Sequence, residues 1–176
     1  MNLLIVVDMQ KDFVDGALGT SEAVAILKNV AEKIKSFDGD ILVTYDTHPE
    51  TYMETNEGKH LPVPHCIKGT PGWELHDAVK AALEGKEYTA IEKPTFGSVV
   101  LPEYLKEFYE TDVLSVTLIG LCTDICVVSN ALLLKANFPE INISVDASCC
   151  AGVTPESHNA ALTTMKMCQI DVIGEE

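Results

Sequence analysis

The sequence contains no arginine: its 12 basic residues are all lysine, against 27 acidic residues and a formal net charge of −15. A protein that binds nucleic acid needs basic patches that neutralise phosphates, so this charge balance argues against nucleic acid as a partner. Arginine is also the residue best suited to bidentate capture of carboxylates and phosphates. Its absence disfavours a substrate with two or more anionic groups.

Three other features are missing. No apolar run approaches the roughly 18 residues of a membrane span, so we expect no membrane partner. The apolar start M-N-L-L-I-V-V-D lacks a basic n-region and a small-residue cleavage site, which predicts a first strand and a cytoplasmic protein rather than a signal peptide. The six cysteines are too sparse for a disulfide framework, and we expect free thiols.

The chain has 176 residues, 47% of them hydrophobic, which suits one globular domain spanning residues 1–176. Continuous apolar runs that stop at an aspartate or a glycine are typical of strands buried on both faces of a parallel sheet. Such runs cover residues 3–7, 41–45, 113–119 and 141–145, with weaker candidates at 88–92 and 170–173.

Helical patterns lie between these runs, at residues 21–37, 101–109, 123–137 and 155–168, and Ser21 is the expected N-cap of the first. Alternating strands and helices predict an α/β fold with three α/β/α layers around a six-stranded parallel sheet. Residues 47–73 do not fit this alternation. They are rich in Pro, Gly, His and Glu, and a loop this long in a compact domain is usually functional or disordered. Its three histidines and one cysteine favour the functional interpretation.

Polar residues follow several of the predicted strands. Ligands of open parallel sheets bind beyond the carboxyl ends of the strands, so Asp8, Asp46 and the segment 120–126 are expected to converge there. Cys126 near a helix N-terminus has a favourable potential for its thiolate, and free backbone N–H groups there can face an oxyanion. Asp8 is the best-placed base for such a nucleophile. A lone cysteine is otherwise a buried core thiol, and this alternative stays open at this point.

Five segments carry a resemblance to a known family. They are D-M-Q-K-D-F (8–13), Y-D-T-H-P-E (45–50), P-H-C-I-K-G-T-P-G (64–72), K-P-T-F-G-S (93–98) and G-L-C-T-D-I-C-V (120–127). In this order, they resemble the motifs of the isochorismatase-like cysteine hydrolases, which include the nicotinamidases. The resemblance covers nearly the whole chain, and five motifs in order are far more specific than one.

The resemblance implies a catalytic set in which Asp8 is the general base, Lys93 the third member and Cys126 the nucleophile. It also implies a cis peptide between Leu121 and Cys122, with the backbone N–H groups of Cys122 and Cys126 facing the oxyanion. Phe13 and Leu121 are the residues expected in the substrate pocket, since an aromatic face such as that of Phe13 suits a flat ring.

A second centre is expected in the histidine-rich loop. Asp46 and His48 are two residues apart and point the same way on an extended segment, while His65 returns from the far end of the loop. Two imidazoles and a carboxylate suit a divalent transition metal. The resemblance implies that this metal, zinc first and iron or manganese as alternatives, holds the pyridine nitrogen of the substrate. Among candidates for a fourth ligand, Glu57 is preferred, followed by Glu54 and then His60.

The predicted function is therefore that of a metal-containing cysteine amidohydrolase of the nicotinamidase type, a reaction of NAD salvage, acting on a small amide through a thioester. A relative that hydrolyses a carbamoyl or ureido compound is the nearest enzymatic alternative. A non-catalytic ligand-binding protein on the same fold is an alternative from another class. The resemblance further implies a homo-oligomer, a dimer or a tetramer.

Overall fold

The computed structural model describes residues 1–109 and 115–175. Within them, six parallel strands form one sheet in the order β3-β2-β1-β4-β5-β6. The strands are β1 (Asn2–Val7), β2 (Asp40–Asp46), β3 (Thr89–Lys93), β4 (Ser115–Leu121), β5 (Asn142–Ala151) and β6 (Asp171–Ile173). This confirms the predicted α/β fold with a six-stranded parallel sheet. Residues 113 and 114 of the predicted fourth strand lie outside the described residues.

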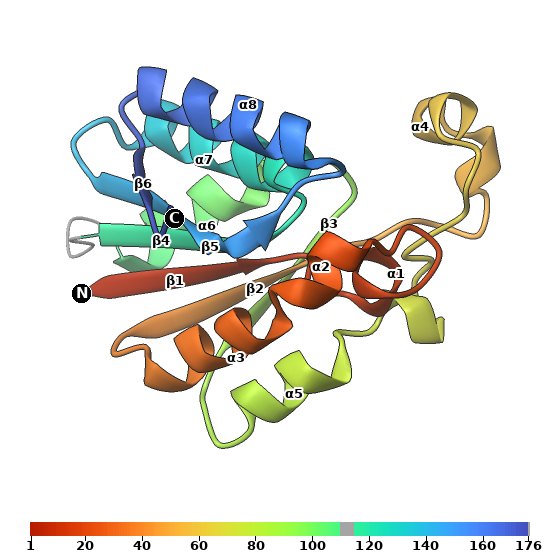
Figure 1. The fold of residues 1–176 in the computed structure, drawn as a ribbon, viewed down its shortest axis with the longest axis horizontal. Coiled ribbons are helices and arrows are strands. Elements are labelled where there is room, and N and C mark those ends of the chain that lie inside the picture. The colour runs from red at the N-terminus through yellow and green to blue at the C-terminus, as the bar shows by residue number, and fades with distance from the viewer. Residues whose placement is uncertain (110–114, 176) are drawn as a thin grey trace.

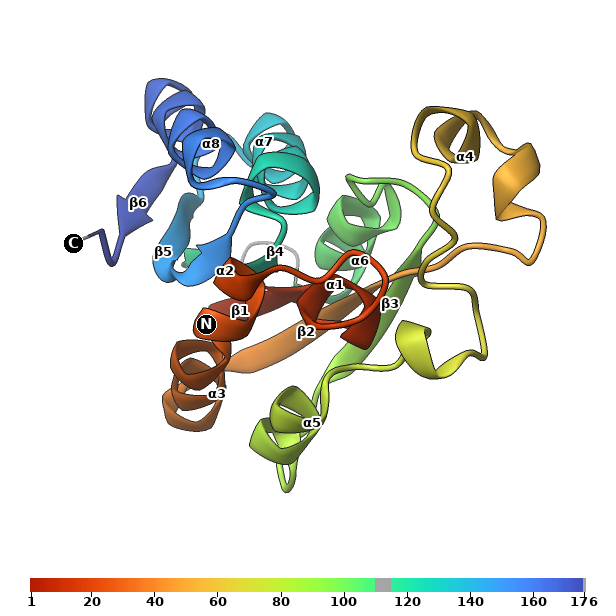
Figure 2. The same cartoon turned by 45° about the vertical axis from the view of Figure 1, so that its right-hand side comes forward.

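Helices cover both faces of the sheet (Figures 1 and 2). One face packs against α6 (Val100–Tyr109), α7 (Val128–Asn137) and α8 (Pro155–Met167). The opposite face packs against α1 (Lys11–Val14), α2 (Ser21–Ala25), α3 (Leu27–Ser36) and α5 (Asp77–Leu83). Each central strand therefore buries both sets of alternating side chains, which is why its sequence is continuously apolar.

Several predicted boundaries were wrong, among them the end of the strand predicted over residues 113–119, which runs past Gly120 to Leu121. The helix predicted over residues 21–37 is two helices that meet at Ile26, and its N-cap is Thr20, whose hydroxyl accepts from Ala23 N, rather than Ser21. The strand predicted over residues 141–145 continues past Asp146 to Ala151. It does so because the Lys33 ammonium pairs with the Asp146 carboxylate at 2.9 Å, so that the acid can lie inside a strand. Helix α5 was not predicted at all.

The segment between β2 and α5 leaves the layered body and returns to it (Figures 1 and 2). It holds a 3₁₀ turn η1 (Tyr52–Glu54), the short helix α4 (Asn56–His60) and a second 3₁₀ turn η2 (Pro71–Trp73). Backbone N–H groups of His48 and Lys68 donate to Cys66 O and His48 O, so the two ends of the excursion pair with each other beside the sheet. Among the described helices, none combines the length and apolarity that crossing a membrane requires.

The strand order reverses between β1 and β4, and this point lies beside the carboxyl end of β1. Gly120 makes the close approach possible: its φ is +116°, and a Cβ at this position would lie 2.1 Å from Val7 O. A glycine is thus required where β4 passes the last residue of β1. Asp8 and Cys122, which directly follow these strands, are brought to the same edge of the sheet.

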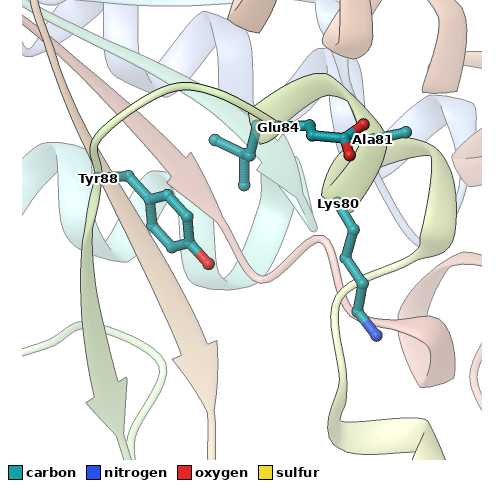
Figure 3. Close-up of a pocket in the computed structure, with 5 residues that line it drawn as sticks. Lys80, Ala81, Glu84 and Tyr88 are labelled. Carbon is teal, nitrogen blue, oxygen red and sulfur yellow. The ribbon is translucent and has the colours of Figure 1, made fainter.

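A surface hollow of about 390 Å³ lies at the amino end of β3 (Figure 3). It is lined by Lys80, Ala81, Leu83, Glu84 and Tyr88. Tyr88 directly precedes β3, whereas Lys93 ends it. The hollow and the residues singled out by the sequence therefore lie at opposite ends of this strand.

Candidate active site

The side chains of Asp8, Lys93 and Cys126 meet at the carboxyl ends of the strands. Lys93 Nζ lies 2.6 Å from Asp8 Oδ2 and 3.4 Å from Cys126 Sγ. All three residues are buried, with 0%, 1% and 4% of their surface exposed. The ammonium therefore stands between the acid and the sulfur, far from bulk water, where its electrostatic effect on both is strong.

The two oxygens of the Asp8 carboxylate have different surroundings. Oδ1 accepts a 2.6 Å hydrogen bond from the Thr44 hydroxyl. Oδ2 lies 2.6 Å from the ammonium of Lys93, which occupies one of the two lone pairs of this oxygen. Oδ2 consequently keeps the capacity to accept a proton.

Burial shifts the pKa values of the three groups. It raises the pKa of the Asp8 carboxyl despite the opposing charge of Lys93. Burial, with the negative charge of Asp8, also raises the pKa of the Cys126 thiol well above its usual value, and Lys93 opposes this only in part. For Lys93, burial alone would lower the pKa, but the neighbouring Asp8, Cys126 and Asp46 outweigh it and raise the value. Burial and Asp8 thus favour the neutral thiol of Cys126, whereas Lys93 favours its thiolate.

Cys126 lies in a single π-helical turn, η3 (Thr123–Val127), between β4 and α7. The N–H groups of Ile125 and Val127 both donate to Cys122 O, at 3.1 and 3.0 Å. The peptide bond between Leu121 and Cys122 is cis, as the family resemblance implied. π-Turns of this kind occur frequently at functional sites.

A second cluster lies beside the first. Asp46, His48 and His65 are buried, and one potential ligand atom from each lies within 4.8 Å of the others. His48 Nε2 is 2.9 Å from Asp46 Oδ2, and His65 Nε2 is 3.6 Å from the same oxygen. Of the fourth-ligand candidates, Glu57 reaches this cluster, since its Oε1 lies 3.6 Å from both imidazole Nε2 atoms. Glu54 and His60 are exposed, and His60 Nδ1 is bonded to Asn56 O.

These residues fit a divalent transition metal. His65 Nδ1 donates to Val63 O at 2.8 Å, which leaves the lone pair of Nε2 directed at the cluster. Burial alone would raise the pKa of Asp46, but the neighbouring His48, His65 and Lys93 lower it below its usual range. Two imidazoles with an ionised carboxylate and a second carboxylate at the rim form a donor set typical of zinc and related ions.

Asp46 connects the two clusters. Its Oδ2 faces the histidines, whereas its Oδ1 lies 3.4 Å from Lys93 Nζ. The motif identified Asp46 only as a potential metal ligand, because contacts across the strand pair β2–β3 are invisible in the sequence. The register of these strands places Asp46 directly opposite Lys93.

The two residues predicted for the substrate pocket have different positions. The Phe13 ring is half-buried, with its centroid 5.4 Å from that of His65, so it forms a wall beside the second cluster. The Leu121 side chain is 1% exposed and packs within the core. The Trp73 ring packs against Tyr45, with ring centroids 5.1 Å apart.

Sequence analysis missed two residues that hold the site. The Gln10 amide is fully buried, donates to Asp46 O and Trp73 O, and accepts from Asp46 N, each at 2.8 Å. The Thr44 hydroxyl donates a hydrogen bond to Asp8 Oδ1. A polar residue inside the apolar run 41–45 was a usable signal for Thr44. The sequence held no signal for the role of Gln10 apart from its place in the motif of residues 8–13.

Comparisons with known proteins agree with this geometry. The family model of the isochorismatase domain matches residues 2–176. A nicotinamidase of Schizosaccharomyces pombe is 26% identical and is aligned over 98% of this chain and 93% of its own length. A nicotinamidase/pyrazinamidase of Mycobacterium tuberculosis is 25% identical over 98% of both chains. The crystal structure of the pyrazinamidase of Pyrococcus horikoshii in complex with zinc superposes with a TM-score of 0.83, at 28% identity over 99% of both chains. With a family model covering almost every residue, this chain belongs to the isochorismatase domain family.

Proposed function

We propose that this protein is a metal-containing cysteine amidohydrolase of the nicotinamidase type, which converts nicotinamide and water into nicotinate and ammonia. The contact of buried Lys93 with both Asp8 and Cys126 carries the proposal, because a protein that only binds a ligand does not need an acid, an amine and a thiol in contact. The curated relatives named as nicotinamidases support the substrate class. The absence of arginine agrees with a neutral substrate that bears no second anionic group.

The residues account for the chemistry in two stages. Asp8 Oδ2 accepts the thiol proton as Cys126 Sγ attacks the amide carbon, and the ammonium of Lys93 stabilises the negative charge that develops. Backbone N–H groups of Cys122 and Cys126 are proposed to face the resulting oxyanion. Asp8 then returns its proton to the leaving nitrogen, so that ammonia departs and a thioester remains. Asp8 next takes a proton from a water molecule as the water oxygen attacks the thioester carbon; the carbon–sulfur bond breaks to release the carboxylic acid, and Asp8 returns the proton to Cys126 Sγ.

Asp46, His48, His65 and Glu57 are proposed to hold a divalent metal, zinc in the first instance. When bound, this ion supplies a Lewis-acid position for a neutral ring nitrogen of the substrate. Phe13 is proposed to pack against the flat face of the ring. The zinc complex of the P. horikoshii relative and the donor set of this site support the choice of metal.

An ammonia-release assay tests the function. The purified, metal-loaded protein is assayed on nicotinamide, pyrazinamide and a set of carbamoyl compounds, together with Cys126→Ala. Cys168→Ala serves as the control, because Cys168 is an exposed thiol at the end of α8. We expect hydrolysis of nicotinamide that falls at least about 1,000-fold in Cys126→Ala and is unchanged in Cys168→Ala. Activity confined to carbamoyl compounds would replace nicotinamide with these compounds as the proposed substrate class. No activity on any compound of the panel would contradict the proposal that the protein is an amidohydrolase.

We also propose a cytoplasmic homo-oligomer, a dimer or tetramer, on the basis of the family resemblance. Light scattering coupled to size-exclusion chromatography measures its mass, and a monomer at micromolar concentration would contradict the assembly.

A further inference from the structure

A buried asparagine links the two segments that carry the sulfur and the ammonium. Asn130 lies in α7, four residues after Cys126, and its side chain is fully buried. Its Nδ2 donates to Cys126 O at 2.8 Å and to Phe96 O at 3.2 Å, while its Oδ1 accepts from Ser98 N at 2.8 Å. One amide thus connects the π-turn of Cys126 with the loop that follows β3.

That loop also holds the lysine. Lys93 Nζ donates to Thr95 O at 3.1 Å, so the carbonyl of a loop residue is one of the four groups around the ammonium. The loop lies directly on the start of α7, because a Cβ on Gly97 would be 3.4 Å from Ser129 Cβ. Its outer side is open, with Phe96 46% exposed. The position of Thr95 O therefore depends on how the loop is attached to α7.

We propose that Asn130 is a positioning residue that sets the spacing of Lys93 and Cys126, by fastening the loop of residues 94–98 to the turn of Cys126. The inference rests on the proposed function, in which Lys93 and Cys126 are the working groups. Asn130 touches neither the substrate nor a reacting atom; it acts through the backbone on both sides. A displacement of about 1 Å between such groups is enough to cost about 100-fold in rate.

The alternative is that Asn130 only stabilises the fold, since an asparagine removed from the core leaves buried carbonyl and N–H groups unsatisfied. The two roles have different signatures. A stability role lowers the unfolding midpoint and leaves the folded enzyme unchanged. A positioning role lowers kcat of the folded enzyme and changes the reactivity of Cys126.

Three variants separate these roles. Asn130→Leu removes both connections. Asn130→Thr keeps one, because a threonine hydroxyl in a helix can bond the carbonyl four residues earlier, which here is Cys126 O, but is too short to reach the loop. Asn137→Leu is the matched control: on the same helix, Asn137 Nδ2 donates to Leu133 O at 2.9 Å, the same four-residue contact away from the site.

The measurements are kcat and KM for ammonia release, the urea midpoint, and the pH profile of Cys126 alkylation by iodoacetamide, followed by peptide mass spectrometry. For folded Asn130→Leu we expect kcat to fall about 10- to 100-fold, KM to stay within about threefold, and the alkylation profile to move to higher pH as Lys93 withdraws. The kcat of Asn130→Thr should lie between those of Asn130→Leu and the wild type. The kcat, KM and alkylation profile of Asn137→Leu should match those of the wild type.

A folded Asn130→Leu whose kcat and alkylation profile both match the wild type would overturn the inference. If Asn130→Leu does not fold, the same two measurements are made on Asn130→Thr. A wild-type kcat and a wild-type alkylation profile in this variant would overturn the proposal. A lower kcat together with a profile shifted to higher pH would support it. The alkylation profile requires no substrate. A wild-type protein that releases no ammonia therefore contradicts the proposed function, while the effect of Asn130 on Cys126 is still measured.

Discussion

The ammonium of Lys93 lies 2.6 Å from the carboxylate of Asp8, and both side chains are completely buried. The same distance separates Lys166 Nζ from Glu175 Oε2 at the surface, where the two side chains are 44% and 42% exposed. The two ion pairs therefore share one separation and differ in burial.

The first prediction concerns stability. Lys93→Met leaves the carboxylates of Asp8 and Asp46 buried without their cation, and should lower the free energy of unfolding by about 3–5 kcal/mol. Lys166→Met should cost less than about 1 kcal/mol, since water screens the exposed pair. Urea unfolding of the two variants measures the difference. Adding Asp8→Asn to Lys93→Met should recover part of the loss, and strictly additive effects of the two changes would contradict the coupling.

The second prediction concerns the reactivity of Cys126. Because burial and Asp8 raise the pKa of this thiol, its alkylation by iodoacetamide should still be rising above pH 8.5, about the ordinary pKa of a cysteine. Asp8→Asn removes a negative neighbour and should move the profile to lower pH. Lys93→Met removes the positive neighbour and should move it to higher pH. Shifts of the same sign in both variants would show that the charges do not act on the sulfur as described.

The third prediction concerns the metal. His48→Ala and His65→Ala should each lower the bound divalent metal measured by elemental analysis, and the double variant should abolish it. His60→Ala is the control, since this exposed histidine lies on the same excursion of the chain.

The fourth prediction separates the two glutamates. Glu57→Gln should weaken metal affinity about 10- to 100-fold in a chelator competition, the range typical of a supporting carboxylate. Glu54→Gln should leave affinity unchanged, since Glu54 is exposed. Equal affinities of Glu57→Gln and the wild type would exclude Glu57 from the site.

The fifth prediction concerns the strand crossing that positions Asp8. Gly120→Ala should destabilise the protein by more than about 2 kcal/mol, because its φ is +116° and the new Cβ would meet Val7 O. Gly85→Ala provides the comparison. The φ of Gly85 is +77°, but no heavy atom lies within 4 Å of its Cβ position, so this substitution strains the backbone without creating a steric clash. Similar urea midpoints for the two variants would contradict a role for the close approach at β1.

Much of the fold could be predicted from local patterns. The apolar runs at residues 3–7 and 41–45 indicated strands buried on both faces, and the positions of Asp8 and Asp46 after them indicated the edge at which ligands bind. Boundaries failed where tertiary contacts override local pattern. Asp146 looked like a strand end, but in the folded protein it pairs with Lys33, more than a hundred residues earlier in the chain.

The sequence by itself determined which residues are available for chemistry and the sheet that carries them, since strand periodicity and motif order are local properties of the chain. Only the tertiary structure decided that Asp46 faces both His48 and Lys93, that Glu57 rather than Glu54 reaches the histidines, and that Asn130 joins the segments of Lys93 and Cys126. The physical reason is that these contacts follow from strand register and from the packing of loops on helices, which depend on all the layers at once.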